Sequence, residues 1–371
     1  TSSFFSFSQS LFSLDANSSI VATKNPENTK GLILDTIVMR TMIENRYNEF
    51  ELYLPFFQQE IIFNAQKFKV YSDDFKIISL TNIGEEIISE NPTILSYKLF
   101  FNGKSIGVIN LFNNEVNATF KFNKKQYEIS KYKDEYILFE SSNSINSSNF
   151  SCAVEDEFSH NISSQVVNST AVVNPVCIEL AIEVDNYTRN TFSSNLETSN
   201  WALAIIAGVS QIYDSEVNAA IVVTYSYIWN TIDPYSAYIN QSSNMLNELV
   251  SQWTTNNVAI NRDLVHLMTK RTNTGTGGIA YLDVLCNNNW GYGFSSNLNN
   301  DTTYSFPNPS YTWNMSVISH ELGHNIGSHH THWCGWLADP SIFFLGGIID
   351  NCVDVEGSCL NNTTSQLGKI M

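Results

Sequence analysis

Residues 320–330 carry a pattern of side chains that could bind a metal ion and use it for hydrolysis. They read His320-Glu321-Leu322-Gly323-His324-Asn325-Ile326-Gly327-Ser328-His329-His330. In a helix, His320 and His324 project from one face a turn apart, so their imidazoles can hold the same ion. Gly327 can adopt a positive φ and end the helix, which lets the chain return His330 as a third nitrogen ligand.

Three histidine ligands predict a catalytic zinc site. They leave one position of a tetrahedral ion open for water, whereas structural zinc sites are closed. Zinc lowers the pKa of that water, and Glu321 is predicted to take its proton as the water attacks a peptide carbonyl. The pattern His-Glu-x-x-His alone arises by chance, but its extension through Gly327 and His330 is far more restrictive. His329 and His332 flank the third ligand and do not fit the spacing.

The elements that must position this segment read as an α/β sheet. From residue 177 onward, short apolar runs alternate with amphipathic stretches of helical period. Alternating helices and buried strands predict an α/β fold. Strands are predicted at residues 178–184, 219–229, 264–268 and 279–285, and helices at residues 195–213, 242–253 and 313–327.

The N-terminal part of the chain reads as β-rich. Side chains alternate between apolar and polar in residues 49–54 and 118–122, as they do in half-buried strands. Residues 97–101 and 105–111 flank Asn102-Gly103, which is a strong signal for a hairpin turn.

Two polar stretches separate this part from the rest. Residues 140–149 and 160–174 have the Ser- and Asn-rich composition of linkers. We therefore predict a β-rich, propeptide-like domain at 1–150, a linker at 151–174 and a catalytic domain at 175–371.

The composition excludes some partners and favours an extracytoplasmic protein. The net charge is -17, so nucleic-acid phosphates would be repelled. No run of 18 apolar residues occurs, so no membrane span is predicted. A charged fraction of only 15%, much Asn, Ser and Thr, and six cysteines that could form disulfides fit a secreted or extracytoplasmic location.

The roles of the individual cysteines leave alternatives open. Cys152 could be a switch thiolate that occupies the open zinc position in a latent form, or it could form a disulfide with Cys177, which is the interpretation that we favour. Cys334 could pair with Cys352 or Cys359 and so hold the loop that follows the zinc motif.

The segment from Pro175 to Met371 resembles the catalytic domain of the adamalysin (reprolysin) family of metzincins. The zinc motif is the highly specific part of this resemblance. Shorter matches are Ile178-Glu179-Leu180, Tyr227-Ile228-Trp229, Asp263, Gly278-Ile279-Ala280-Tyr281 and Gly368-Lys369-Ile370-Met371. The family usually has an acidic residue where this chain has Thr331, and it continues where this chain ends. The resemblance implies an α/β metzincin fold, a mixed twisted sheet with an active-site helix, truncated at its C-terminus.

The resemblance also implies roles outside the zinc motif. Met371 would sit in a Met-turn and form a hydrophobic floor beneath the histidine rings. Substrate would lie extended and antiparallel to the edge strand that begins at Gly278. Glu179 and Asp263 match acidic calcium ligands of the family, and an ordinary pair of acids at strand ends is the alternative.

These observations predict a zinc-dependent endopeptidase that hydrolyses extracellular proteins and is made as a zymogen. Its cofactors would be Zn²⁺ and, under the hypothesis above, Ca²⁺, and its partners would be protein or peptide substrates. The alternative is a metzincin scaffold of modest activity used for binding, with the N-terminal domain as an adhesion module. The intact Glu321 and three histidines favour the enzyme, because inactive relatives typically lose one of them. The sequence predicts no oligomeric state.

Overall fold

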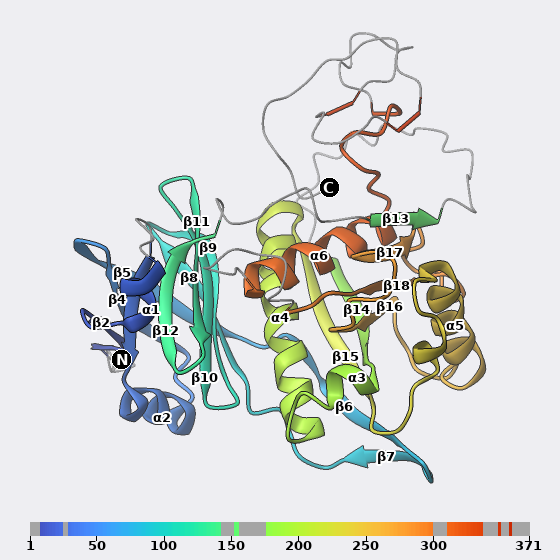
Figure 1. Ribbon diagram of the computed structural model, residues 1–371, viewed down its shortest axis with the longest axis horizontal. Coiled ribbons are helices and arrows are strands. Elements are labelled where there is room, and N and C mark those ends of the chain that lie inside the picture. Colours follow the sequence, from blue (N-terminus) through green and yellow to red (C-terminus); the bar gives the residue numbers. More distant parts are fainter. Residues whose placement is uncertain are drawn as a thin grey trace, which may run out of the picture.

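The structure, a computed structural model, describes residues 8–24, 29–141, 152–155, 176–299, 310–336, 348–349 and 356–357. These residues form two β-sheets, and helices α4 (Asn195–Val217) and α6 (Ser310–Asn325) lie between them (Figure 1). No helix in these ranges is both long and apolar enough to cross a membrane.

The first sheet contains ten strands in the order β1-β4-β5-β8-β9-β10-β11-β12-β3-β2. The predicted hairpin is confirmed: Asn102 and Gly103 join β8 to β9 with positive φ angles of 49° and 75°. The strands are β1 (Ser8–Ser10), β2 (Phe12–Asp15), β3 (Thr29–Leu34), β4 (Glu49–Phe56), β5 (Gln59–Phe68), β8 (Leu95–Phe101), β9 (Lys104–Phe112), β10 (Glu115–Phe122), β11 (Lys125–Tyr132) and β12 (Glu135–Glu140).

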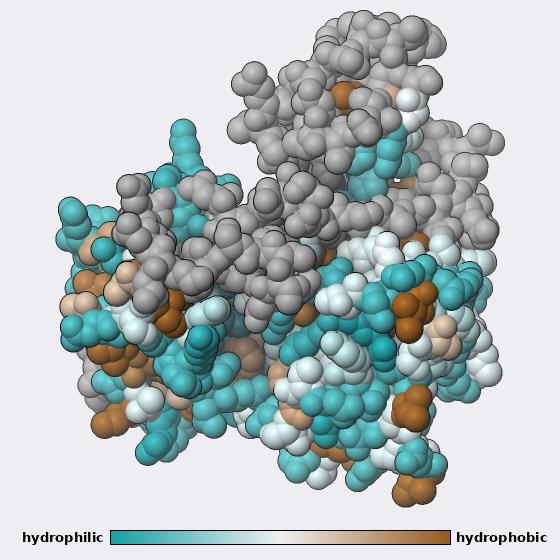
Figure 2. Space-filling view, viewed as in Figure 1, coloured by the Kyte–Doolittle hydropathy of each residue, from teal (hydrophilic) through white to brown (hydrophobic). Residues whose placement is uncertain are grey.

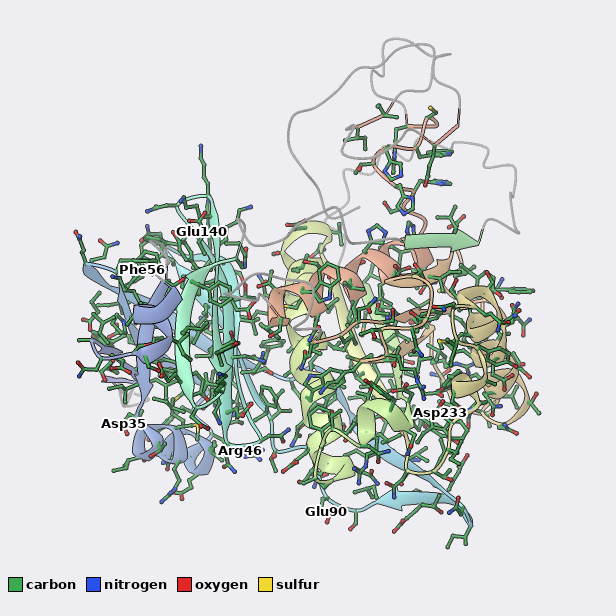
Figure 3. All side chains as sticks on the ribbon, viewed as in Figure 1. Asp35, Arg46, Phe56, Glu90, Glu140 and Asp233 are labelled. Carbon is green, nitrogen blue, oxygen red and sulfur yellow. The ribbon has the colours of Figure 1, made fainter. Side chains whose placement is uncertain are left out.

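Alternating side chains give this sheet its own hydrophobic core. In β4, the apolar residues of the predicted alternation are buried: Phe50, Leu52 and Leu54. Helix α2 (Thr36–Asn45) adds Met42 to the same core, and α1 (Ser19–Lys24) precedes β3. Asp35 begins α2, because its carboxylate accepts hydrogen bonds from the first free backbone N–H groups (Figure 3).

The second sheet contains eight strands in the order β13-β17-β18-β16-β14-β15-β6-β7. Strand β14 is parallel to β15 and β16, and β17 is antiparallel to β18, so the sheet is mixed. Its elements are β6 (Tyr71–Thr81), β7 (Gly84–Ile88), β13 (Cys152–Glu155), β14 (Val176–Val184), α3 (Asn186–Arg189), β15 (Ala219–Trp229), η2 (Pro234–Ala237), α5 (Ser242–Thr255), β16 (Leu264–Met268), β17 (Gly278–Tyr281) and β18 (Tyr292–Ser295).

Most elements predicted for this region are confirmed. The α/β class is correct, and the predicted strands at 178–184, 219–229 and 264–268 are present. The strand predicted at 279–285 ends at Tyr281, and β18 was not predicted because a run of four residues carries too little periodicity. The active-site helix begins at Ser310 rather than at residue 313.

Helix α4 is buried on nearly all sides because it packs against β15, α6 and strand β9 of the first sheet. Gly208 allows the close approach of α6: a Cβ at this position would lie 2.4 Å from Sδ of Met315. The hydroxyl of Tyr213 donates to the carbonyl of Ser319 at 2.7 Å, which ties the two helices together. Helix α4 therefore holds α6, the helix that carries the predicted zinc motif, through contacts at Met315 and Ser319.

Strands β6 and β7 extend the second sheet although they belong to the N-terminal part of the chain. Strand β6 pairs in parallel with β15, and β7 returns antiparallel to β6 (Figure 1). The residue bounds predicted for the domains stay predictions, but the two parts of the chain share one sheet.

On the face shown in Figure 2, outside the grey atoms, hydrophobic residues lie scattered among hydrophilic ones. Among the described residues, the most exposed large hydrophobic side chains come from separate elements and loops: Ile37, Ile83, Ile232 and Val258. Single exposed residues of this kind are ordinary on protein surfaces.

Candidate active site

Helix α6 and the turn after it bring the three predicted ligands together. The Nε2 atom of His320 lies 3.1 Å from Nε2 of His324 and 3.2 Å from Nε2 of His330. Gly327 has a φ of 99°, which is the turn that returns the chain to the helix. Nitrogens bound tetrahedrally to zinc at about 2.0–2.1 Å lie about 3.3 Å apart. The donor set and its spacing therefore fit zinc.

The far nitrogens of two of these rings are held by oxygen atoms. Nδ1 of His324 lies 2.7 Å from the carbonyl of Ser328, and Nδ1 of His330 lies 2.7 Å from Oε1 of Glu356. An N–H at Nδ1 leaves the Nε2 lone pair for a metal. Burial, with the neighbouring histidines, lowers the pKa of His324 to about 2, so this imidazole is neutral, as a metal ligand must be.

The predicted base, Glu321, lies fully buried against strand β17. A Cβ added to Gly278 would lie 2.2 Å from Oε1 of Glu321, so only glycine leaves room for this carboxylate. In the structure, the absence of a side chain at Gly278 makes room for the Glu321 carboxylate. The structure thus brings the predicted base and the predicted substrate strand, Gly278 to Tyr281, into contact.

Asn325 fixes the end of α6 to the sheet. Its Nδ2 donates to the carbonyls of Tyr281 at 2.9 Å and of Tyr292 at 3.0 Å. The backbone N–H of Asp283 donates to the carbonyl of His324 at 2.9 Å. Sequence reasoning missed Asn325, although it lies inside the zinc motif, because its partners are more than 30 residues away.

The predicted substrate strand is not at the edge of the sheet. Strand β13 pairs in parallel with β17, and Cys152 lies opposite Gly278 in the register. The sequence prediction that β17 is an edge strand is therefore wrong for this structure, because the chain itself covers that edge. The favoured disulfide between Cys152 and Cys177 is also wrong, since Cys177 is a free, exposed cysteine.

The two predicted calcium ligands do lie together, at the start of β14 and β16. Oδ2 of Asp263 accepts from the backbone N–H of Glu179 at 2.8 Å, and Asn261 donates to the Glu179 carboxylate at 2.9 Å. These contacts give the acids a structural role. Calcium binding by this pair stays a prediction.

The predicted Met-turn residue, Met371, lies outside the described residues, as do Cys352 and Cys359. The floor beneath the zinc ligands and the pairing of Cys334 stay predictions for that reason.

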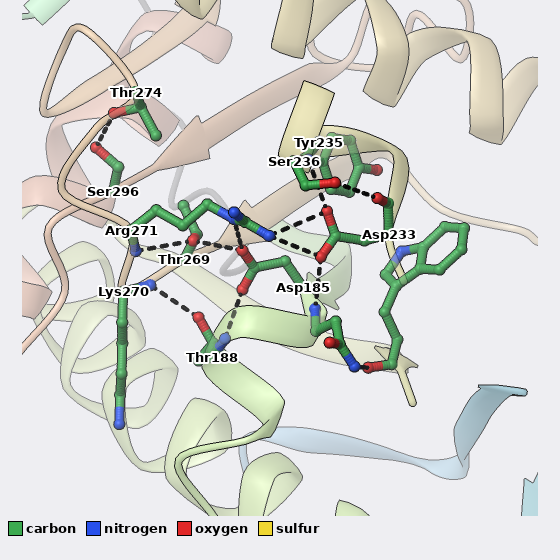
Figure 4. Close-up of polar contacts among 12 residues, drawn as sticks. Asp185, Thr188, Asp233, Tyr235, Ser236, Thr269, Lys270, Arg271, Thr274 and Ser296 are labelled. Atoms are coloured by element: carbon green, nitrogen blue, oxygen red, sulfur yellow. Dashed lines mark hydrogen bonds and ion pairs between the residues drawn. The ribbon is translucent and has the colours of Figure 1, made fainter. Parts of the chain in front are cut away.

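A buried ion-pair cluster lies at the carboxyl ends of the parallel strands (Figure 4). The Arg271 guanidinium contacts Asp185 at 2.6 Å and Asp233 at 2.9 Å. Asp185 also begins α3 by accepting from the N–H of Thr188, and burial raises its pKa. This cluster was not predicted from the sequence, because its members come from three separate loops. Its ion pairs join the chain segments that follow three neighbouring strands, β14, β15 and β16.

Comparison with known proteins finds one matching family. A family model described as metallo-peptidase family M12 matches residues 174–365, which is just over half of the chain. The crystal structure of metalloproteinase-II from Bacteroides fragilis is similar with a TM-score of 0.45 and 11% sequence identity, over 76% of this chain and 82% of that one. On the family match, the chain belongs to the M12 family of metallopeptidases.

Proposed function

We propose that this protein is a zinc-dependent endopeptidase that hydrolyses extended polypeptides outside the cytoplasm. The observation that carries the proposal is the clustering of three histidine nitrogens at the end of α6, the helix that also carries the buried Glu321. The Glu321 carboxylate lies against Gly278 of strand β17. The low charge density and the six cysteines support the extracytoplasmic location.

The chain's own residues supply the proton transfer and the placement of substrate. Zinc, when bound, would polarise a water molecule and the peptide carbonyl. Glu321 would accept the proton of that water, because it follows the first ligand and lies buried in the site. A substrate strand beside β17 would receive backbone hydrogen bonds, and it would pass next to Glu321 at Gly278.

The position of strand β13 supports the proposal that the protein is made as a zymogen. Strand β13 occupies the side of β17 where an antiparallel substrate would bind, and it runs in the parallel direction. A parallel strand presents its peptide groups in the reverse sense, so it can fill the site without placing a peptide bond for attack. Cys152 lies opposite Gly278, which keeps it a candidate for a thiolate that blocks the zinc.

The test compares the intact chain with a chain cut at a protease site inserted between residues 156 and 175. The cut wild-type chain should hydrolyse a fluorogenic casein substrate, and the intact chain should be much slower. In the cut chain, Glu321→Gln should keep its zinc and lose about 10²–10⁴ in rate. Glu216→Gln, on the exposed end of α4, is the matched control.

Two results would contradict the proposal separately. Normal turnover by zinc-loaded Glu321→Gln would contradict the proposed role of Glu321 as the proton acceptor. An intact chain that is as active as the cut chain would contradict the proposal that the protein is a zymogen.

A further inference from the structure

Glu356 lies against the third zinc-ligand candidate although it is 26 residues further along the chain. Oε1 of Glu356 is 2.7 Å from Nδ1 of His330 and 3.2 Å from Nε2 of His332. The rings of His330 and His332 are nearly parallel, with centroids 4.8 Å apart and an interplanar angle of 12°. One carboxylate oxygen therefore contacts two stacked imidazoles.

The backbone fixes Glu356 in this place. Its N–H donates to the carbonyl of His332 at 3.1 Å, and its carbonyl accepts from the N–H of Cys334 at 2.9 Å. A bridge between Trp333 and Glu356 joins the same two segments. The backbone of Glu356 is thus paired with the segment that carries His332 and Cys334.

The contact acts on the nitrogen of His330 that faces away from the other ligands. Its Nε2 points toward His320, so Nδ1 must carry the hydrogen when Nε2 binds a metal. A carboxylate that accepts this hydrogen selects the correct tautomer, fixes the ring plane and makes Nε2 a stronger donor. The corresponding acceptor for His324 is the backbone carbonyl of Ser328, which no substitution removes.

We propose that Glu356 is a positioning residue for His330, which orients this ligand for zinc, and that His332 holds the carboxylate in place. The proposal rests on the proposed zinc site. The same three residues also form a group that could hold a metal of its own. The 2.7 Å separation of Oε1 and Nδ1 matches a charge-assisted hydrogen bond, and it is shorter than the separation between ligands of one ion such as the histidine nitrogens above.

The experiment measures zinc affinity in the full chain by competition with a chromophoric chelator. Glu356→Ala should weaken zinc binding about 10–100-fold. Glu356→Gln, whose amide oxygen can still accept from Nδ1, should lose less. His332→Ala should have a smaller effect than Glu356→Ala. The visible absorption of the Co²⁺-substituted protein should change in Glu356→Ala, because the geometry at the metal changes.

His329→Ala is the matched control, because His329 lies in the same loop but stacks on Trp333 at 3.7 Å. This variant should bind zinc within about twofold of the wild type. Equal zinc affinity in Glu356→Ala and the wild type would overturn the proposal, and so would an equal loss in His329→Ala. A Glu356→Gln variant as weak as Glu356→Ala would show that bulk charge matters rather than orientation. A second equivalent of zinc that is lost on Glu356→Ala would reveal a separate metal site instead. If the wild-type chain binds no zinc, the proposed function fails.

Discussion

Each sheet contains a fully buried glutamate, and the two carboxyl groups have hydrogen-bond partners in different parts of the molecule. Burial raises the pKa of both Glu128 and Glu183 to about 7. Glu183, on β14, accepts hydrogen bonds from the side chains of Trp229, Tyr235 and Trp253, all from its own region. Its partners cross-link the second sheet to α5 and η2.

Glu128, on β11 of the first sheet, finds its partners in the other region. Its carboxylate accepts from the backbone N–H groups of Tyr311 at 3.2 Å and Thr312 at 2.9 Å, in the first turn of α6. These N–H groups have no partner within the helix, and the positive end of the helix dipole favours a carboxylate there. The N-terminal region therefore caps the helix that carries the zinc motif, whereas Glu183 only stabilises its own region.

The largest effect is expected for Glu183→Ala. This change leaves the buried donors of Tyr235 and Trp253 and the partly buried donor of Trp229 without their acceptor, and it creates a cavity. We therefore expect a loss of about 4 kcal/mol in the free energy of unfolding. Urea unfolding at pH 5, where the buried carboxyl is neutral, measures it, with Glu216→Ala as the exposed control. A loss below about 1 kcal/mol would mean that these hydrogen bonds contribute little.

A second test uses pH and applies to both glutamates. Because each folded pKa, about 7, lies above the ordinary value of 4.5, the folded state binds the proton more tightly. The resulting stability is complete below about pH 4.5 and is lost as pH rises through about 7, by about 3 kcal/mol per group. Glu128→Gln and Glu183→Gln should each remove that decline, measured by unfolding of the metal-free chain from pH 4 to 8. An unchanged decline in either variant would show that its carboxyl titrates normally.

The smallest and most local effect is expected for Glu128→Ala. Loss of the cap should cost about 2 kcal/mol. The effect of Glu128→Ala should differ from that of Glu183→Ala in where it occurs along the chain. Hydrogen exchange should increase in residues 310–315 and stay unchanged in β14. Equal protection of α6 in the wild type and Glu128→Ala would break the contrast between the two regions.

The sequence predicted those parts of the site that depend on local spacing. His320, Glu321, His324 and His330 lie within eleven residues, so helix geometry and one glycine turn relate them. The contact of Glu128 with Thr312 joins residues 184 positions apart, and that of Glu356 with His330 joins residues 26 positions apart. No sequence periodicity predicts such pairings. The isolated acids in their sequence context look like ordinary surface residues.

For the fold as well, local elements were predictable from the sequence and long-range pairings were not. Long periodic segments such as 219–229 and 242–253 were predictable because the chain repeats one local rule over several turns or pleats. The pairing of β6 with β15 and of β13 with β17 was not predictable. The side-chain pattern of a strand indicates that it belongs to a sheet but not which strand lies beside it.

The second sheet takes both of its outermost segments from sequence that precedes residue 176: β13 on one side, and β6 with β7 on the other. Loss of everything before β14 would uncover β17, which the proposed substrate binding requires, and would also uncover β15 at the far edge. An uncovered strand can pair with strands of other chains and promote aggregation. A cut confined to the neighbourhood of β13 would open only the substrate side. For the proposed zymogen, we therefore expect an active form of two fragments that stay together, with the N-terminal fragment still covering β15.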